Sequence, residues 1–285
     1  MFTENQLSEI KKLISPEKKV VIITHYNPDG DAIGSALGLK HFLNNMGVEP
    51  TVLAPNDFPK FLKWMPDAKK VVIAEYKRKT AGEAIYKADV IFCLDFNAHN
   101  RIGILGDWLM KSWAKKILID HHQQPEDFDY VYSDVTIPAT CQMVYHFIEA
   151  LGREDLVDQN VAECLYTGIM TDTGGFRFRS TSATTHRIVA NLIEKGANPA
   201  MITSNTWDTN SVSRLHLLSL ILGRIELVKD GKVAVLYLKR EELKEFGFEK
   251  GDTEGFVNYG LSIAGTKMAA FFMEDLHEDY IKISF

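Results

Sequence analysis

The stretch VVIITHYNPDGDAIGSALG, residues 20–38, carries the strongest signal for the fold. Its β-branched start, VVIIT (20–24), is typical of a short strand that is buried on both faces. The loop HYNPDGD follows, rich in Asn, Pro, Asp and Gly, and then a helical pattern that Gly47 stops. We therefore expect a strand, a polar loop and a helix in succession, the unit from which open parallel sheets are built.

The first two-thirds of the chain repeats this alternation of short apolar runs and helical patterns. The further apolar runs are TVLA (51–54), VVIA (71–74), VIFCL (90–94) and KILI (116–119). The helical patterns cover residues 4–14, 140–151, 160–171 and 184–195. Interleaved strands and helices predict an α/β fold, with a mostly parallel sheet flanked by helices.

The pattern changes after about residue 200. A helical stretch, SVSRLHLLSLILGRIEL (211–227), leads into VAVLYLK (233–239) through a hairpin-type Asp-Gly pair. KMAAFFM (267–273) and YIKISF (280–285) read as a second hairpin. We expect residues 1–190 to form the first domain, 191–214 a helical linker, and 215–285 a smaller α+β domain with antiparallel strands.

Composition and charge limit the classes of function. The 285 residues are 46% hydrophobic and 25% charged, with a formal net charge of −6. Long nucleic acid is bound mainly through Lys and Arg on phosphates, so an acidic chain without a basic run is poorly suited to it. No apolar run approaches the roughly 20 residues that span a bilayer, and the start lacks the pattern of a secretory signal. Three cysteines without metal-type spacing complete the prediction of a cytoplasmic protein.

Carboxylates and imidazoles gather where the predicted strands end. They are His25, Asp29 and Asp31 after the first strand, Asp95 after VIFCL, Asp120, His121 and His122 after KILI, and Asp172 at the end of a helical stretch. Because ligands bind outside the carboxyl ends of strands in open α/β sheets, we expect these side chains to share one edge. So many carboxylates in one place repel one another unless a cation compensates them. Mixed imidazole and carboxylate ligands suit two divalent ions, Mn²⁺ in preference to Mg²⁺, which would polarise a phosphate and activate a water.

Four segments, in order along the chain, resemble the signature motifs of the DHH phosphoesterase family. They are THYNPDGDAIGS (24–35), Asp95 in CLDFNAHNRIG, the run Asp120-His121-His122, and Asp172 in GIMTDTGGFRF. EGFVNYGLSIAG (254–265) and KMAAFFM look like the substrate-binding domain associated with that family. Among its subfamilies, the chain most resembles the bifunctional oligoribonuclease/pAp phosphatases, or nano-RNases. Family members continue past the strand equivalent to YIKISF into a glycine-rich motif, so we expect the second domain to be incomplete at Phe285.

The resemblance implies roles for individual residues. Its metal ligands would be His25, Asp29 and Asp95 for one ion, and Asp31, Asp95, His121 and Asp172 for the other, with Asp95 shared. Asp120 would orient the site, and His122 would contact the scissile phosphate and protonate the leaving oxygen. Arg101 is a candidate phosphate clamp. Arg177 and Arg179 alternate in FRFR, which favours an edge strand over a phosphate contact.

The leading prediction is a cytoplasmic hydrolase acting on 3′-phosphoadenosine 5′-phosphate (pAp) or on RNA of a few nucleotides. Within the same superfamily, the alternatives are a cyclic or linear dinucleotide phosphodiesterase and an inorganic pyrophosphatase or exopolyphosphatase. A pyrophosphatase needs a Lys- and Arg-rich signature in its second domain, and no such cluster follows residue 214. The non-enzymatic alternative is a metal-bound nucleotide sensor. Because family members often pair, a homodimer is also expected.

Overall fold

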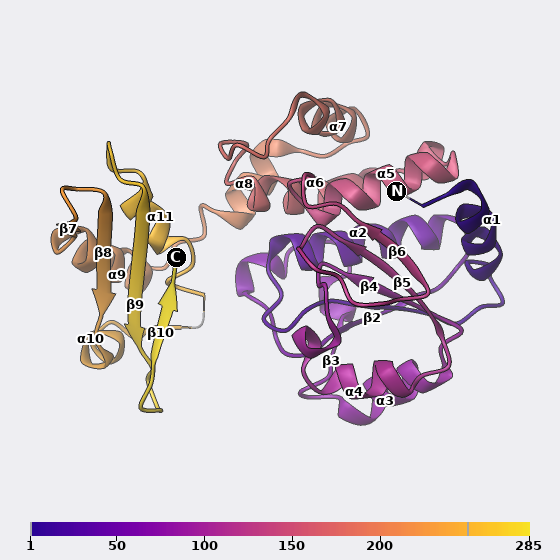
Figure 1. The fold of residues 1–285 in the computed structure, drawn as a ribbon, viewed down its shortest axis with the longest axis horizontal. Helices are drawn as coiled ribbons and strands as arrows, with labels where there is room; N and C mark the ends of the chain where they lie inside the picture. Colours follow the sequence, from indigo (N-terminus) through magenta and orange to yellow (C-terminus); the bar gives the residue numbers. More distant parts are fainter. Residues whose placement is uncertain (1, 250) are drawn as a thin grey trace. The chain divides into compact units, whose positions relative to one another are not determined.

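The apolar runs of the first two-thirds of the chain form a six-stranded sheet in which all neighbouring strands are parallel (Figure 1). The computed structural model describes residues 2–249 and 251–285. The strands are β1 (Val20–Ile23), β2 (Thr51–Ala54), β3 (Val72–Ile73), β4 (Val90–Leu94), β5 (Lys115–Asp120) and β6 (Tyr130–Ser133). Their order in the sheet is β3-β2-β1-β4-β5-β6, so the direction of winding reverses between β1 and β4.

Helices cover both faces of this sheet, which explains why the central strands β1 (VVII) and β4 (VIFCL) are apolar and buried at every position. On one face lie α2 (Gly30–Asn45), α5 (Thr140–Leu151) and α6 (Gln159–Asp172), and on the other α3 (Arg78–Lys87) and α4 (Ile104–Lys111) (Figure 1). Successive strand residues alternate between the two cores: Ile22 packs with the first group of helices and Ile23 with the second. The predicted α/β fold with a parallel sheet is confirmed.

The remaining helices of the first unit complete its outer layer. They are α1 (Glu4–Leu13), α7 (Ala183–Glu194), α8 (Pro199–Thr206) and the short 3-10 helices η1 (Lys60–Leu62), η2 (Ala68–Lys70), η3 (His99–Ile102) and η4 (Glu154–Leu156). The chain divides into two compact units between Thr206 and Trp207. That division lies within residues 191–214, which contain the end of α7, all of α8 and the start of α9 (Val212–Gly223).

Helices α2 and α6 approach each other very closely, and glycines make the approach possible. A Cβ atom added at Gly34 would lie 2.7 Å from the carbonyl oxygen of Cys164. One added at Gly168 would lie 2.1 Å from the sulfur of Cys141 and 2.9 Å from a carboxylate oxygen of Asp31. Real side chains do not tolerate such distances, so glycine is required at both positions for these helices to cross as they do.

The second unit is a four-stranded sheet with helices. Its elements are α9, β7 (Glu226–Val228), β8 (Val233–Leu238), α10 (Arg240–Glu245), α11 (Phe256–Leu261), β9 (Met268–Glu274) and β10 (Ile281–Ser284). The strand order is β10-β9-β8-β7. The predicted hairpin β9–β10 is antiparallel, and so is β7–β8, which the predicted Asp-Gly turn joins. The central pair, β8 and β9, is parallel because α10 and α11 lie between them in the chain and bring it back to the starting end. The α+β prediction holds, and the sheet is mixed.

Local details differ from the sequence prediction in several places. The helical reading of residues 211–227 is wrong at its end, because α9 stops at Gly223 and Glu226–Val228 pairs with β8. The turn that joins these strands has positive φ at Lys229, Asp230 and Gly231. Of VVIA (71–74), only Val72–Ile73 is a strand. Within the described parts of the chain, no helix is long and apolar enough to cross a membrane.

Candidate metal centre

The side chains predicted to bind metal come together at the carboxyl ends of β1, β4 and β5, where the strand order reverses. Among the described residues, ligating atoms lie within 4.8 Å of one another in three groups: His25, Asp29 and Asp95; Asp31, His121 and Asp172; and Asp95, His121 and His122. The first two groups contain the six predicted ligands. His25 follows β1, Asp95 follows β4 and His121 follows β5, while Asp172 is the last residue of α6. The structure therefore brings together all six predicted ligands, and their role in binding metal remains a prediction.

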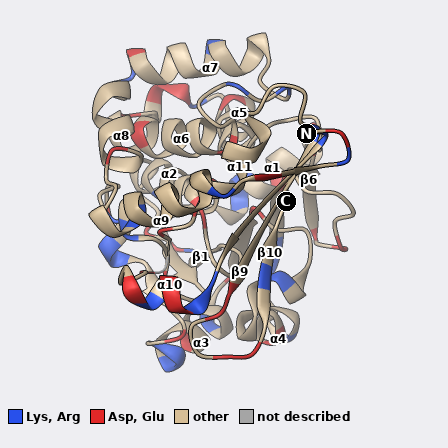
Figure 2. Cartoon of the chain, turned by 90° about the vertical axis from the view of Figure 1, so that its left-hand side faces the viewer, with Lys and Arg blue, Asp and Glu red and all other residues tan. Residues whose placement is uncertain are grey.

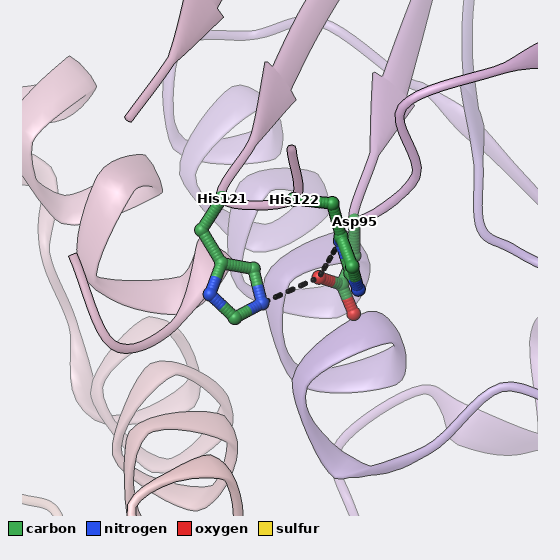
Figure 3. Close-up of side chains that lie close together, drawn as sticks. All are labelled: Asp95, His121 and His122. Atoms are coloured by element: carbon green, nitrogen blue, oxygen red, sulfur yellow. Dashed lines mark ion pairs between the residues drawn. The ribbon is translucent and has the colours of Figure 1, made fainter. Parts of the chain in front are cut away.

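Asp95 lies between the two groups. One of its carboxylate oxygens, Oδ2, is 3.5 Å from Nε2 of His25, and the other, Oδ1, is 3.4 Å from Nε2 of His121. Figure 3 shows Asp95 pointing between the rings of His121 and His122. Its backbone has a positive φ of 65°, and its N–H donates to the carbonyl of Ile119 on β5. Because each oxygen faces the imidazole of a different group, this carboxylate is placed to be a ligand shared by two ions.

The other carboxylates are held by the starts of two helices. Asp29 caps α2, accepting hydrogen bonds from the N–H groups of Asp31 and Ala32 at 3.1 Å. Asp31 is almost fully buried and accepts from the N–H groups of Thr140 and Cys141, the first residues of α5, at 2.5 and 2.8 Å. These bonds aim the two carboxylates before any ligand arrives.

Thr140 is a site residue that the sequence analysis missed. Its hydroxyl donates to Oδ1 of Asp95 at 2.9 Å while its N–H donates to Asp31, so it orients one carboxylate from each group. Residues 140–151 were predicted to be a helix, and a polar residue at the start of a helix was the available signal. What could not be read from the sequence was that this helix start faces Asp31, more than 100 positions away.

The two imidazoles are oriented by backbone carbonyls. Nδ1 of His25 lies 2.9 Å from the carbonyl oxygen of Tyr26, and Nδ1 of His121 lies 3.2 Å from that of Ile137. A hydrogen bond from Nδ1–H to a carbonyl leaves Nε2 as the nitrogen that can donate its lone pair. In both residues Nε2 is the atom that faces Asp95, so the rings are presented as metal ligands usually are.

The charges of this cluster are unbalanced unless a cation or protons compensate them. Burial alone would lower the pKa of both histidines, but the facing carboxylates raise it to about 11 for His25 and about 10 for His121. Burial and the nearby charge of Asp95 raise the pKa of Asp172 to about 7 and that of Asp31 well above its usual range. Protons thus gather where carboxylates crowd, and a divalent cation would displace them. The donor set fits a metal centre.

His122 and Asp120 form a separate pair beside the ligands. Asp120 is fully buried, and its Oδ1 is 2.7 Å from Nδ1 of His122. Its other oxygen is buried and has no hydrogen-bond partner among the residues that the structure describes. Nδ1 of His122 is also 3.8 Å from Asp95. Because Asp120 engages Nδ1, Nε2 is the nitrogen of His122 left to meet a substrate.

The predicted arginine contacts have different outcomes. Arg101 is exposed on η3, and its carbonyl accepts a hydrogen bond from the N–H of Tyr26, next to His25, at 2.7 Å. Arg177 is not on an edge strand, so that reading is wrong. Residues 174–176 all have positive φ and turn the chain, and Nε of Arg177 donates to the carbonyl of Gly174. Alternation over four residues was too short a pattern to outweigh two glycines.

The sequence of the chain is similar to a known protein family and to proteins of known name. A sequence profile of the DHH family N-terminal domain matches residues 19–169. The bifunctional oligoribonuclease and PAP phosphatase NrnA of Thermus thermophilus is 29% identical over 280 residues, covering 98% of this chain and 78% of that protein. The protein of the same name from Bacillus subtilis is 24% identical over 280 residues, covering 98% of this chain and 84% of that protein.

Solved structures show the same relationship. An exopolyphosphatase-related protein from Bacteroides fragilis superimposes with a TM-score of 0.94 at 40% sequence identity. The superposition covers 99% of this chain and 82% of the other. The likeness therefore extends over the sequences of both units.

Proposed function

The chain belongs to the DHH family of phosphoesterases, and we propose that it hydrolyses short oligoribonucleotides and pAp with the help of two divalent metal ions. It is a hydrolase by family membership. Two relatives that align over 98% of the chain are named for both activities, which supports this choice of substrates. The observation that carries the two-metal reading is Asp95, whose two oxygens face imidazoles of different clusters.

The metal roles in this proposal follow the geometry of the two groups. His25, Asp29 and Asp95 would hold one ion, and Asp31, Asp95, His121 and Asp172 the other. Mixed imidazole and carboxylate donors favour Mn²⁺ over Mg²⁺. When bound, such ions polarise a phosphoryl oxygen and lower the pKa of a bound water. The chain itself supplies fixed ligands, oriented from behind by Thr140 and by the carbonyls of Tyr26 and Ile137.

His122 is proposed to be the general acid. Asp120 accepts the hydrogen bond from Nδ1, which fixes the orientation of the ring. The proton on Nε2 can then pass to the leaving oxygen of the ester as the bond to phosphorus breaks. The other oxygen of Asp120 is buried and has no hydrogen-bond partner among the described residues, so the ring of His122 is the side chain that this carboxylate positions.

Substrate binding is proposed to involve Arg101 and the second unit. Arg101 would clamp a phosphate, and residues 215–285 would form the substrate-binding domain, joined to the catalytic domain of residues 1–190 by residues 191–214. Acidic and basic residues are interspersed along elements of that unit such as α10, whose sequence is REELKE (Figure 2). Mixed charges and a net charge of −6 favour a short substrate over long RNA. Three unpaired, buried cysteines support a cytoplasmic location.

A substrate panel tests the proposal. The protein would be incubated with Mn²⁺ and, in parallel, with pAp, a diribonucleotide, inorganic pyrophosphate and polyphosphate. We expect phosphate release from pAp and mononucleotides from the dinucleotide. Turnover of pyrophosphate or polyphosphate alone would contradict the nucleotide assignment. Metal binding without turnover of any of the four would instead point to a nucleotide sensor.

A further inference from the structure

Tyr26 is an exposed aromatic residue in the first motif, THYNPDGDAIGS (24–35), in which most of the other residues are buried. Its side chain is 53% exposed, whereas Thr24 and His25 before it are buried. A single exposed aromatic side chain is common and means little by itself. Tyr26 differs because it directly follows a predicted metal ligand and because its backbone is fixed on both sides.

Two hydrogen bonds hold the backbone of Tyr26. Its N–H donates to the carbonyl of Arg101 at 2.7 Å, and its carbonyl oxygen lies 2.9 Å from Nδ1 of His25. The next residue, Asn27, has a positive φ of 56° and exchanges hydrogen bonds with the buried side chain of Asn56 at 2.7 and 2.8 Å. The loop therefore holds Tyr26 at one place beside the first metal cluster.

The ring of Tyr26 lies near Gly103, at the end of the segment that carries Arg101. A Cβ atom added at Gly103 would be 3.6 Å from Cδ2 of the ring, an ordinary van der Waals distance. The segment is anchored in turn, because the N–H and Nδ1 of His99 both lie within 3 Å of the same carboxylate oxygen of Glu126. The ring therefore has the fixed Gly103 segment on one side, with room for one added carbon between them, and is about half open to solvent.

We propose that Tyr26 is the surface on which a nucleobase of the substrate stacks. Stacking on aromatic side chains is how proteins bind short single strands without reading their sequence. An already ordered ring loses little conformational freedom when a base lands on it. Arg101, on the neighbouring segment η3, would bind a phosphate of the same nucleotide. The two segments together would then contact both the base and a phosphate. This inference rests on the proposed nucleotide substrate.

Replacing Tyr26 while removing the base from the substrate tests the proposal. For Tyr26→Ala we expect KM for pAp to rise by about 5- to 150-fold, the usual range for one stacked base. KM for the matched 1,2-dideoxyribose 3,5-bisphosphate, which lacks adenine, should change less than about twofold. Tyr26→Phe should behave like the wild type, and Tyr26→Leu like Tyr26→Ala, because the flat ring is what stacks. Tyr86→Ala, at an exposed tyrosine on α3, is the matched control.

A binding signal separates stacking from effects on turnover. The wild type should quench the fluorescence of a 2-aminopurine dinucleotide within the mixing time of a stopped-flow experiment, before product forms, and Tyr26→Ala should not. Equal KM ratios for both substrates in Tyr26→Ala, or no quenching by the wild type, would overturn the stacking role. If the wild type hydrolyses no nucleotide at all, the proposed function itself fails, and the two failures are thus distinguishable.

Discussion

At the scale of single residues, Asp95 has a left-handed backbone conformation and a carboxylate that contacts His25, His121 and Thr140. A φ of 65° is tolerated by Asp and Asn better than by most residues. Asp95→Asn therefore keeps the backbone and the shape while removing the charge between the two imidazoles. We expect less than a few per cent of the activity and loss of the paired metal, measured by initial rates and by metal analysis after desalting. Asp155→Asn, at an exposed ion pair with Arg153, is the control. Substantial remaining activity would show that Asp95 is not the shared ligand.

The pair of adjacent histidines makes a second prediction at this scale. His121 faces three carboxylates, whereas His122 is bonded to Asp120 through Nδ1. His122→Ala should keep the metal content and lower kcat by about 10²–10⁴, as the loss of a general acid does. Initial rates and metal analysis of the same preparation check this. Loss of metal would mean that His122 is a ligand.

At the scale of elements, the close crossing of α2 and α6 supports the site. Gly168 lies directly behind Asp31, so Gly168→Ala must push Asp31 or Cys141 aside. We expect the free energy of unfolding to fall by about 1–3 kcal/mol and metal affinity to fall with it. Urea unfolding followed by tryptophan fluorescence measures the first. Gly223→Ala, at the end of α9 with open space around the added Cβ, should be neutral or stabilising by up to about 1 kcal/mol.

The loop before η2 is joined to α2 by an ion pair between Asp67 and Lys40, and the contribution of this pair to stability depends on pH. Burial opposes ionisation of Asp67, but Lys40 and Lys70 lower its pKa from 3.8 to about 2. A lowered pKa in the folded state stabilises the protein above the unfolded pKa, and the gain is lost as pH falls towards the folded one. Asp67→Asn keeps a residue that tolerates the positive φ. Its free energy of unfolding should be about 1 kcal/mol below that of the wild type at pH 7, and this difference should shrink near pH 3. Urea midpoints over this pH range check it, and a constant difference would exclude charge as the cause.

Elements with one strong periodic signal were predictable, and those that depend on distant partners were not. The strands VIFCL and KILI and the helices at 140–151 and 184–195 lie within one or two residues of their predicted bounds. Helix α3, with the sequence RKTAGEAIYK, buries only Ala81, Gly82 and Ile85, so its apolar stripe is too thin to detect. Strand β6 has only four residues, at the edge of the sheet, and its sequence YVYS became a strand by pairing with β5.

At the scale of the whole molecule, the two units have separate hydrophobic cores. The two clusters of the first unit contain buried residues from Phe2 to Ile202, and the cluster of the second runs from Leu217 to Met273. We therefore expect a fragment of residues 1–206 to fold alone and to bind the same number of metal ions as the whole chain. Circular dichroism and metal analysis test this. Its KM for pAp should be higher if the second unit binds substrate, and an unfolded fragment would show that the cores depend on each other.

The candidate site was predictable because parallel strands deliver their carboxyl ends to one edge. His25, Asp95 and His121 could be grouped from their positions after apolar runs alone. Two features could be seen only in the three-dimensional structure. The strand order makes β1 and β4 neighbours, and the start of α5 faces Asp31. Tyr26 gave no signal in the sequence, because its position depends on the turn at Asn27 and on the hydrogen bond from its N–H to the carbonyl of the distant Arg101.

The separation of the ligands along the chain sets an order of events during biosynthesis. His25 and Asp172 belong to the same candidate centre, yet the five connections between strands β1 to β6, and then helix α5, lie between them. A ribosome must therefore release most of the first unit, and the chain must complete its long-range pairing, before any high-affinity site exists. If the predicted ligands bind metal, its uptake would be a late step, because only the finished fold brings these side chains together for an ion to stabilise. A cell short of metal would accumulate folded but empty enzyme, ready to be loaded when supply returns.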